Sequence, residues 1–569
     1  MSLSGAMPVM LRLVCGFAMA ASVGAMVAPA SHAQVTRQPP DLVLVGGKVF
    51  TSDTAKPWAE AVAIRGDRIT AVGTTTAIRG LVGPRTRVID VGGRVVTPGF
   101  NDAHEHLAGG NPGVDVALGG EAADLSGLQV LDSVRVAVAR VPRGTWVRGL
   151  VWVRAFEDTV LRRAALDRVA PDHPVLLVTI WGHGVILNTA AMRALDVPED
   201  VRDPFGGWYE RDARGRLTGR LDEYAGWIAR RNFRAVVPES TMIANLRRFA
   251  QQELRLGITS VQDMTMNFEP ATAARVFPAA GLPLRVHLYE LPMPTATSLN
   301  IGQWDSLPRQ LAPNVTVRGQ KWVLDGSPLE GLMFTRGPQM GRAPDWRGHL
   351  NFPADSLRVI FAAALRAREQ LALHAVGDSA VVIVLSLMES LAPDSAWRPL
   401  RVRFEHGGIA AARDLWPRAM AKGVVIVPNL QLSPPPHVVR MLPKVVVDSM
   451  ESWRAPIVSG AFPTALGSDA TSRSPFAGLH MELSLPFATH PSRETLVRAY
   501  TLGSAYAEFA EREKGTLAPG MLADIAVLSQ DIFTIPVDAL PRTESVLTLV
   551  GGKVVWDAGV LRSTAGQMR

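Results

Sequence analysis

The chain has 569 residues, 47% of them hydrophobic, so it can bury a sizeable core and form a large barrel with accessory parts. Its formal net charge of +7 comes from scattered arginines, since only seven lysines occur. Arginine pairs such as Arg162-Arg163 are typical of solvated helix faces, which gives no reason to expect a nucleic-acid partner. The composition also excludes a low-complexity chain.

Residues 1–33 read as a secretory signal. They contain one charge, Arg12, an Ala/Val/Met-rich stretch and the small-residue cleavage site Ser31-His32-Ala33 before Gln34. A membrane anchor is the alternative, but the apolar stretch is Ala/Gly-rich and only marginally long enough to span a bilayer. We therefore expect a secreted or periplasmic protein with no stable membrane anchor after cleavage.

The only cysteine, Cys15, lies inside this segment. The mature chain would then have no thiol, which removes cysteine nucleophiles, cysteine metal ligands and disulfides. Histidine, carboxylates and a lysine carbamate are left as the available metal ligands.

The two ends of the chain carry similar sequences. Residues 41–50 (DLVLVGGKVF) and 547–556 (LTLVGGKVVW) share the string VGGKV, and both read as strand, Gly-Gly turn and strand. We expect residues 40–98 and 514–562 to pair in one small β-sandwich. Chance reuse of the same turn chemistry is the alternative.

The most informative motif follows the apolar run 95–100 and contains His104 and His106. On a strand, two histidines separated by one residue point the same way and can hold one divalent metal ion. An HxH pair also arises by chance in loops. The Pro-Gly pair at 98–99 and the small residues at 108–110 favour a strand that ends beneath an open site. Glu105 would face away from the imidazoles, and we give it no metal role.

Between His106 and Gly257 lies far more chain than a loop between two strands requires, and such insertions are usually functional. We interpret residues 110–250 as an inserted cap, with helices near 128–140 and 241–256 and a strand through 175–180. His183, in the phrase WGHGVILN, is a candidate for substrate contact. A packed structural histidine is the alternative.

Seven more apolar runs follow, at 257–263, 282–287, 319–326, 371–378, 402–407, 424–429 and 465–470. Stretches of helical character lie between them, such as 355–370 and 411–422. Strands that alternate with helices predict a parallel sheet, and polar groups at strand C-termini mark the active site of a (β/α)8 barrel. With the HxH segment the predicted strands number eight, and residues 99–513 form the barrel.

Several polar residues stand at the ends of these runs. Lys321 lies in an apolar strand, where burial favours the neutral amine that carbon dioxide needs to form a carbamate. Asp378 and Glu405 are either acceptors that orient neighbouring histidines or solvated strand ends. His437, on a stiff proline loop, is a candidate for substrate contact.

The phrases PGFNDAHEH, GITSVQDM, KWVLDGS, HAVGDSAV, RFEHGG and GSDA resemble the metal-dependent amidohydrolase superfamily, and in particular its amidohydrolase-3 branch, which includes N-substituted formamide deformylases. The resemblance covers nearly all of the mature chain. It implies an α/β fold with a (β/α)8 TIM-type barrel and one or two divalent metal ions. Zinc suits the ligand set best, with manganese or iron as alternatives. The implied ligands are His104, His106, Lys321 as a carbamate, His374, His406 and Asp469.

The resemblance further implies an exported hydrolase that cleaves an amide, formamide or N-acyl carbon–nitrogen bond with metal-activated hydroxide. Asp469 is the candidate proton shuttle. Two alternatives stay open: an ester, lactone or phosphoester hydrolase with the same metal centre, and a catalytically dead secreted binding protein. The expected partner is a small-molecule substrate, and homo-oligomerisation is left open.

Overall fold

The computed structural model describes residues 38–118, 124–328, 330–339, 342–407, 413–441, 444, 447, 450, 454, 457–458, 460, 463–469 and 473–564. The expected secretory signal, residues 1–33, lies outside the described residues. So do Gly408 and Ala470, the last residues of two of the quoted motifs, and the first two residues of the helix expected at 411–422.

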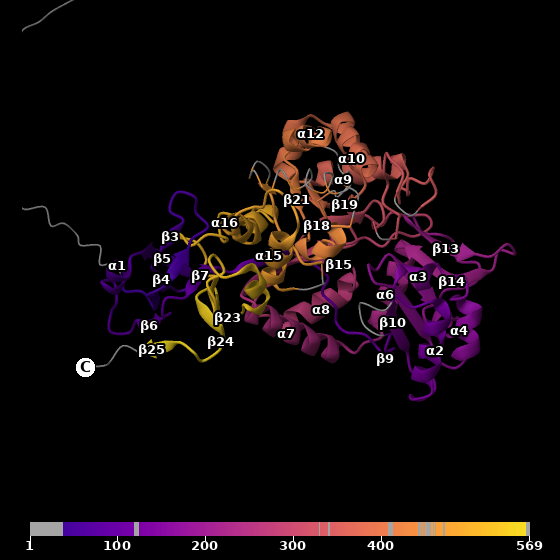
Figure 1. Ribbon diagram of the computed structural model, residues 1–569, viewed down its shortest axis with the longest axis horizontal. Coiled ribbons are helices and arrows are strands. Elements are labelled where there is room, and N and C mark those ends of the chain that lie inside the picture. Colours follow the sequence, from indigo (N-terminus) through magenta and orange to yellow (C-terminus); the bar gives the residue numbers. More distant parts are fainter. Residues whose placement is uncertain are drawn as a thin grey trace, which may run out of the picture. The chain divides into compact units, whose positions relative to one another are not determined.

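A barrel of parallel strands lies at the centre of the fold (Figure 1). Its strands run in the order β21 (Val425–Val427), β20 (Arg403–Glu405), β19 (Leu371–His374), β18 (Val315–Val323), β16 (Arg285–Glu290), β15 (Ile258–Thr265) and β8 (Phe100–Glu105). Every neighbouring pair in this series is parallel. A short strand, β17 (Gln310–Ala312), pairs antiparallel with β18 outside the series.

The eighth member of the barrel is an extended segment and not a regular strand. Within it, Ala465 N donates to Ile426 O at 3.0 Å, and Ala103 N donates to Leu466 O at 2.9 Å. The segment therefore bridges β21 and β8 and nearly closes the barrel. Asp469 N also donates to His104 O at 2.8 Å, although the backbone of Asp469 is left-handed with φ 55°, a conformation outside the strand region. The predicted barrel fold is confirmed, and only the regularity of this one member differs.

Helices cover the barrel because their apolar residues recur at helical spacing. In α9 (Ala354–Ala367) the buried residues include Leu357, Ile360, Phe361 and Ala364, which form one apolar stripe. This helix confirms the one predicted at 355–370, although it ends earlier, at the left-handed Arg368 (φ 52°). Among the described residues no single helix is long and apolar enough to cross a membrane, but one bent pair, 378–391 with 394–400, meets those criteria jointly.

Two further sheets contain strands from both ends of the chain, so yellow strands lie beside indigo ones in Figure 1. One sheet has the order β25 (Arg562–Thr564), β6 (Arg87–Asp90), β1 (Leu42–Val45), β4 (Ala61–Arg65) and β5 (Arg68–Gly73). The other has the order β24 (Lys553–Asp557), β23 (Ser545–Val550), β22 (Ile525–Leu528), β7 (Val95–Pro98), β2 (Lys48–Phe50) and β3 (Trp58–Ala59). Side chains of both sheets share one apolar cluster, which includes Leu44, Val96 and Leu547.

The two VGGKV strings fold differently. In the second string Gly551 (φ 54°) and Gly552 (φ 71°) are both left-handed, and β23 pairs with β24 as a hairpin. In the first string only Gly46 is left-handed (φ 69°), and β1 and β2 belong to different sheets. Each string is a strand, a Gly-Gly turn and a strand, as predicted, but only the second forms a hairpin.

The insertion after β8 contains its own six-stranded sheet. The order is β13 (Gly207–Arg211), β14 (Leu217–Glu223), β12 (Gly184–Leu187), β11 (Val175–Thr179), β10 (Val147–Val151) and β9 (Val114–Asp115). Its helices include α2 (Gly127–Val138), α4 (Arg163–Val169) and α6 (Tyr224–Ala235). We call residues 114–235 the cap. The next helix, α7 (Glu239–Arg255), packs on α8 (Pro270–Ala280) and β15 of the barrel.

Candidate metal centre

The histidines of the HxH motif meet Asp469 where β8 ends. His106 Nε2 lies 3.2 Å from Asp469 Oδ1, and His104 Nε2 lies 3.5 Å from the same oxygen. One ligand atom from each of these three residues lies within 4.8 Å of the other two. This spacing lets one metal ion contact all three side chains.

His374 and His406 complete the cluster from β19 and from the residue after β20. The His406 ring centroid lies 4.9 Å from that of His104 and 4.5 Å from that of His374. His406 Nδ1 is also 3.7 Å from Asp469 Oδ2. The structure therefore brings together four of the predicted histidines and the predicted aspartate.

Lys321 lies on β18 and is almost fully buried. Its Nζ atom has no hydrogen-bond partner within the described part of the chain. Burial lowers the pKa of this amine to about 8, although Glu405 and Asp469 favour the charged form. A buried amine that is readily neutral and has no partner is the chemical requirement for a carbamate.

Glu405 fixes the orientation of His104 by contacting its Nδ1 atom. Its Oε2 lies 2.5 Å from His104 Nδ1, and its Oε1 accepts from Arg403 Nε at 2.7 Å. Burial would raise the pKa of Glu405, but Arg403 and His104 outweigh it and hold this pKa far below the usual range. An ionised carboxylate only accepts, so His104 carries its proton on Nδ1 and leaves Nε2 for a metal.

Other groups orient the remaining imidazoles. His106 Nδ1 lies 3.0 Å from Met264 O, and His406 Nδ1 lies 2.8 Å from Asn429 Oδ1. Both contacts place the proton on Nδ1. Of the two acidic residues predicted beside histidines, only Glu405 contacts one: Asp378 accepts from the backbone of Arg336 at 2.8 Å. Asn429 and Arg403 had no predicted role, although both stand in the strand-end segments that the sequence marks.

Glu105, between the two histidines, points away from them. Its Oε2 accepts from Ser468 Oγ at 2.8 Å. It therefore ties β8 to the segment that carries Asp469.

The donor set fits a divalent metal ion. Burial lowers the pKa of His104 to about 4 and that of His406 to about 3, so both are neutral at pH 7. Burial opposes ionisation of Asp469, but the neighbouring histidines outweigh it and hold its pKa well below the ordinary value. Among the described residues, His374 Nε2 has no hydrogen-bond partner. Neutral imidazoles and an ionised carboxylate are the forms that bind metal.

The cap contributes His183 to this cluster. Its ring centroid lies 5.1 Å from that of His374, and both Glu223 oxygens lie 3.0 Å from its Nδ1. Burial opposes its charge, but Glu223 outweighs burial and raises the pKa of His183 to about 9. His437 is different: it is exposed on α13 (Pro436–Val439), and within the described residues no hydrogen bond or ring contact joins it to the cluster.

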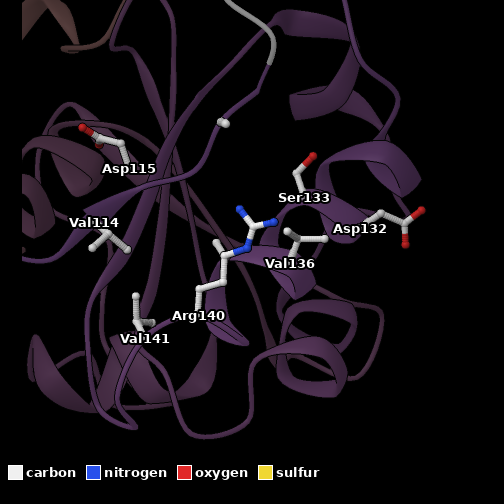
Figure 2. Close-up of a pocket in the computed structure, with 9 residues that line it drawn as sticks. Val114, Asp115, Asp132, Ser133, Val136, Arg140 and Val141 are labelled. Atoms are coloured by element: carbon white, nitrogen blue, oxygen red, sulfur yellow. The ribbon is translucent and has the colours of Figure 1, made fainter.

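A cavity of about 60 Å³ opens beside His406 and Asn429. Its apolar wall includes Leu432, Leu485 and Phe487. A larger cavity, of about 420 Å³, lies on the cap between β9 and α2, where Arg140, Asp115 and Ser133 line it (Figure 2). None of the candidate site residues lines the larger cavity.

Comparison with known proteins gives matches over most of the chain. A family model described as "Amidohydrolase family" matches residues 87–556. The N-substituted formamide deformylase of Arthrobacter pascens is 28% identical, over 90% of this chain and 97% of that protein. A putative amidohydrolase of Bacillus subtilis is 27% identical, over 90% of this chain and 98% of that protein.

Solved structures share the fold. An uncharacterized metal-dependent hydrolase from Pyrococcus horikoshii has a TM-score of 0.65 at 19% identity, over 87% of this chain and 99% of that one. An adenosine deaminase from Xanthomonas campestris, solved with bound zinc, has a TM-score of 0.51 at 15% identity, over 91% of this chain and 94% of that one.

Proposed function

We propose that this chain, which belongs to the amidohydrolase family, hydrolyses the carbon–nitrogen bond of a small amide, formamide or N-acyl compound. It is a metal-dependent hydrolase of the amidohydrolase type, related to N-substituted formamide deformylase. The observation that carries the proposal is the meeting of Asp469 with the two histidines of the HxH motif.

The proposed metal site holds one or two divalent ions. Zinc is our choice because nitrogen and oxygen donors from histidine and aspartate suit it. Lys321 is proposed to carry a carbamate, which supplies two anionic oxygens where the free amine has no partner. The proposed ligands are His104, His106, Lys321, His374, His406 and Asp469.

Bound divalent ions of this kind supply Lewis acidity and lower the pKa of water from about 15.7 towards about 7. Asp469, held ionised by the neighbouring histidines, accepts a proton from the attacking water and later delivers it to the departing nitrogen. The water oxygen bonds to the carbonyl carbon, the carbon–nitrogen bond breaks, and an acid and an amine leave. Because Glu223 holds His183 Nδ1, we propose that His183 Nε2 contacts the substrate carbonyl.

The cavity beside His406 supports a small substrate group on one side of the scissile bond. The cavity has a volume of about 60 Å³ and is lined by Leu432, Leu485 and Phe487 and also by the charged pair Arg454 and Glu482. A short acyl chain would pack against its apolar part. His437 is exposed on α13 and stays a proposed substrate contact.

A panel of substrates tests the proposed reaction. Formamides, N-acyl amino acids, lactones and phosphotriesters should be compared at equal concentration with metal-replete protein. We expect the largest kcat/KM for one of the two amide classes. A preference for lactones or phosphotriesters would favour the ester or phosphoester alternative, and inactivity on all four would favour the binding protein.

Export is also part of the proposal. It rests on the signal-like sequence of residues 1–33 and on the confinement of the only cysteine to that segment. Intact-mass analysis of protein from its native host should show a chain that begins near Gln34. Retention of residues 1–33 would contradict export with cleavage.

A further inference from the structure

Two arginines of the cap, Arg230 and Arg234, share one face of α6 at a spacing of four residues. Both are partly buried. Arg230 donates to Gly182 O at 2.9 Å. Arg234 donates to the side-chain oxygens of Asn111, at 3.1 Å, and of Asn267. All of these acceptors are uncharged.

Neither arginine forms an ion pair with a described residue, whereas the arginines around them do. Arg231 Nη1 lies 3.7 Å from Glu269 Oε1, and Arg148 Nε lies 2.5 Å from Asp115 Oδ1. Burial lowers the pKa of Arg230 to about 10. Burial, followed by repulsion from Arg230 and Arg148, holds the pKa of Arg234 well below its ordinary value. Two partly buried cations without a counter-charge are costly, and a bound anion would remove that cost.

The acceptors of these arginines are linked to chain neighbours of two site histidines. Gly182 precedes His183, which contacts His374 by its ring. Asn267 donates to Leu107 O at 2.8 Å, and Leu107 follows His106. Arg230 is therefore held by the cap loop that bears His183. Arg234 is held by Asn111, on the loop that follows His106, and by Asn267, on the loop after β15.

We infer that Arg230 and Arg234 bind a carboxylate of the substrate, so that the enzyme acts on amides that carry a carboxylate, of which N-acyl amino acids are the simplest. This inference rests on the proposed amide hydrolysis. Arginine suits the task because its planar guanidinium presents several donors to a carboxylate. The competing explanation is that the pair only clamps the cap to the barrel loops.

A matched pair of substrates separates these explanations. N-acetyl-leucine and N-acetylisopentylamine differ only in the carboxylate, and both enantiomers of N-acetyl-leucine should be tried. Wild-type protein should prefer the better enantiomer by at least about tenfold in kcat/KM. Arg230→Gln and Arg234→Gln should each lower kcat/KM for this enantiomer of N-acetyl-leucine by about 10- to 100-fold, mainly through KM. Each should change kcat/KM for N-acetylisopentylamine by less than about twofold.

Arg143→Gln is the matched control, because it removes the same charge from an exposed cap arginine that is paired with Asp172. Arg143→Gln should leave kcat/KM for both substrates unchanged. Melting temperature and circular dichroism show whether each variant folds. Equal losses on both substrates in the Arg230 and Arg234 variants would overturn the inference in favour of the clamp.

A binding measurement keeps this result apart from the proposed reaction. Calorimetric titration of the purified holoenzyme with 4-methylpentanoate, which has a carboxylate and no amide, should show binding that Arg230→Gln weakens about tenfold and Arg143→Gln does not. If wild-type protein hydrolyses neither these two amides nor the formamides of the panel but this dependence holds, the proposed reaction fails and the carboxylate site stands. If only inorganic phosphate binds in an Arg230-dependent way, the carboxylate assignment is overturned.

Discussion

The Nδ1 atom of His104 lies 2.5 Å from Oε2 of Glu405, and both side chains are almost fully buried. Arg403 holds the other carboxylate oxygen at 2.7 Å. This chain of contacts decides which ring nitrogen of His104 carries the proton, and hence which nitrogen faces Asp469. Glu405 thus acts on the proposed metal centre through His104.

We expect Glu405→Gln to lower metal affinity by about 10- to 100-fold. The neutral amide side chain would hold the His104 ring less firmly than the ionised carboxylate does. Competition with a chelator measures this affinity. Glu389→Gln, at an exposed glutamate paired with Arg418, is the control and should bind metal normally. Normal metal affinity in folded Glu405→Gln protein would contradict this role.

His104→Ala and His106→Ala should each abolish hydrolysis and leave the fold largely intact. Both imidazoles point at Asp469 from the end of β8, a strand that the whole barrel supports, so their loss empties a site and removes little packing. Circular dichroism and turnover should be measured on the same metal-stripped and reconstituted samples. Wild-type turnover in either variant would refute the metal assignment.

Lys321→Ala should lose metal and activity, and added acetate should partly restore both by placing a carboxylate in the vacated space. Added acetate should not restore metal or activity to Lys321→Arg, because the guanidinium fills the space and stays charged. Metal analysis with and without acetate measures the effect. One ion per chain in wild-type protein, together with an experimental density map that shows an unmodified amine at Lys321, would favour a lysine that binds the substrate directly.

The gathering of polar side chains at the strand ends could be predicted because parallel strands place their C-terminal residues together. The choice of the proposed ligands among them came from the resemblance to the amidohydrolase superfamily. Distant pairings could not be predicted. Glu405 meets His104 across 301 positions of the chain, and nothing near Glu405 indicates that partner. The left-handed backbone of His406 (φ 62°) and of Asp469 (φ 55°) also has no local signal, since neither is glycine.

Repeated strings were a weaker guide. The first VGGKV string crosses between two sheets and has one left-handed glycine, whereas the second forms a hairpin and has two. Identical letters do not determine these φ angles. The role of His437 stays a prediction, because the direction in which a proline-rich loop points depends on packing elsewhere in the fold.

Acid should destabilise the barrel partly through His287. Burial lowers its pKa to about 4 from 6.5, and its Nε2 lies 3.0 Å from Arg318 O. The folded state therefore binds a proton less readily than the unfolded state. The stability that this difference provides is complete above about pH 6.5 and is lost as the pH falls towards 4, by about 3 kcal/mol at pH 4.

His287→Gln keeps a donor for the carbonyl and cannot titrate. We expect its melting temperature to fall less between pH 7 and pH 4 than that of wild-type protein. Parallel curves for the two proteins would show that His287 does not contribute.

Metal content measured together with amide turnover tests the assignment of a metal-dependent amide hydrolase most directly. We expect purified protein to hold roughly one or two divalent ions per chain. A chelator should remove ions and amide turnover in parallel, and added zinc should restore both. Full turnover by metal-free protein, or metal-replete protein that hydrolyses no amide, would contradict the assignment.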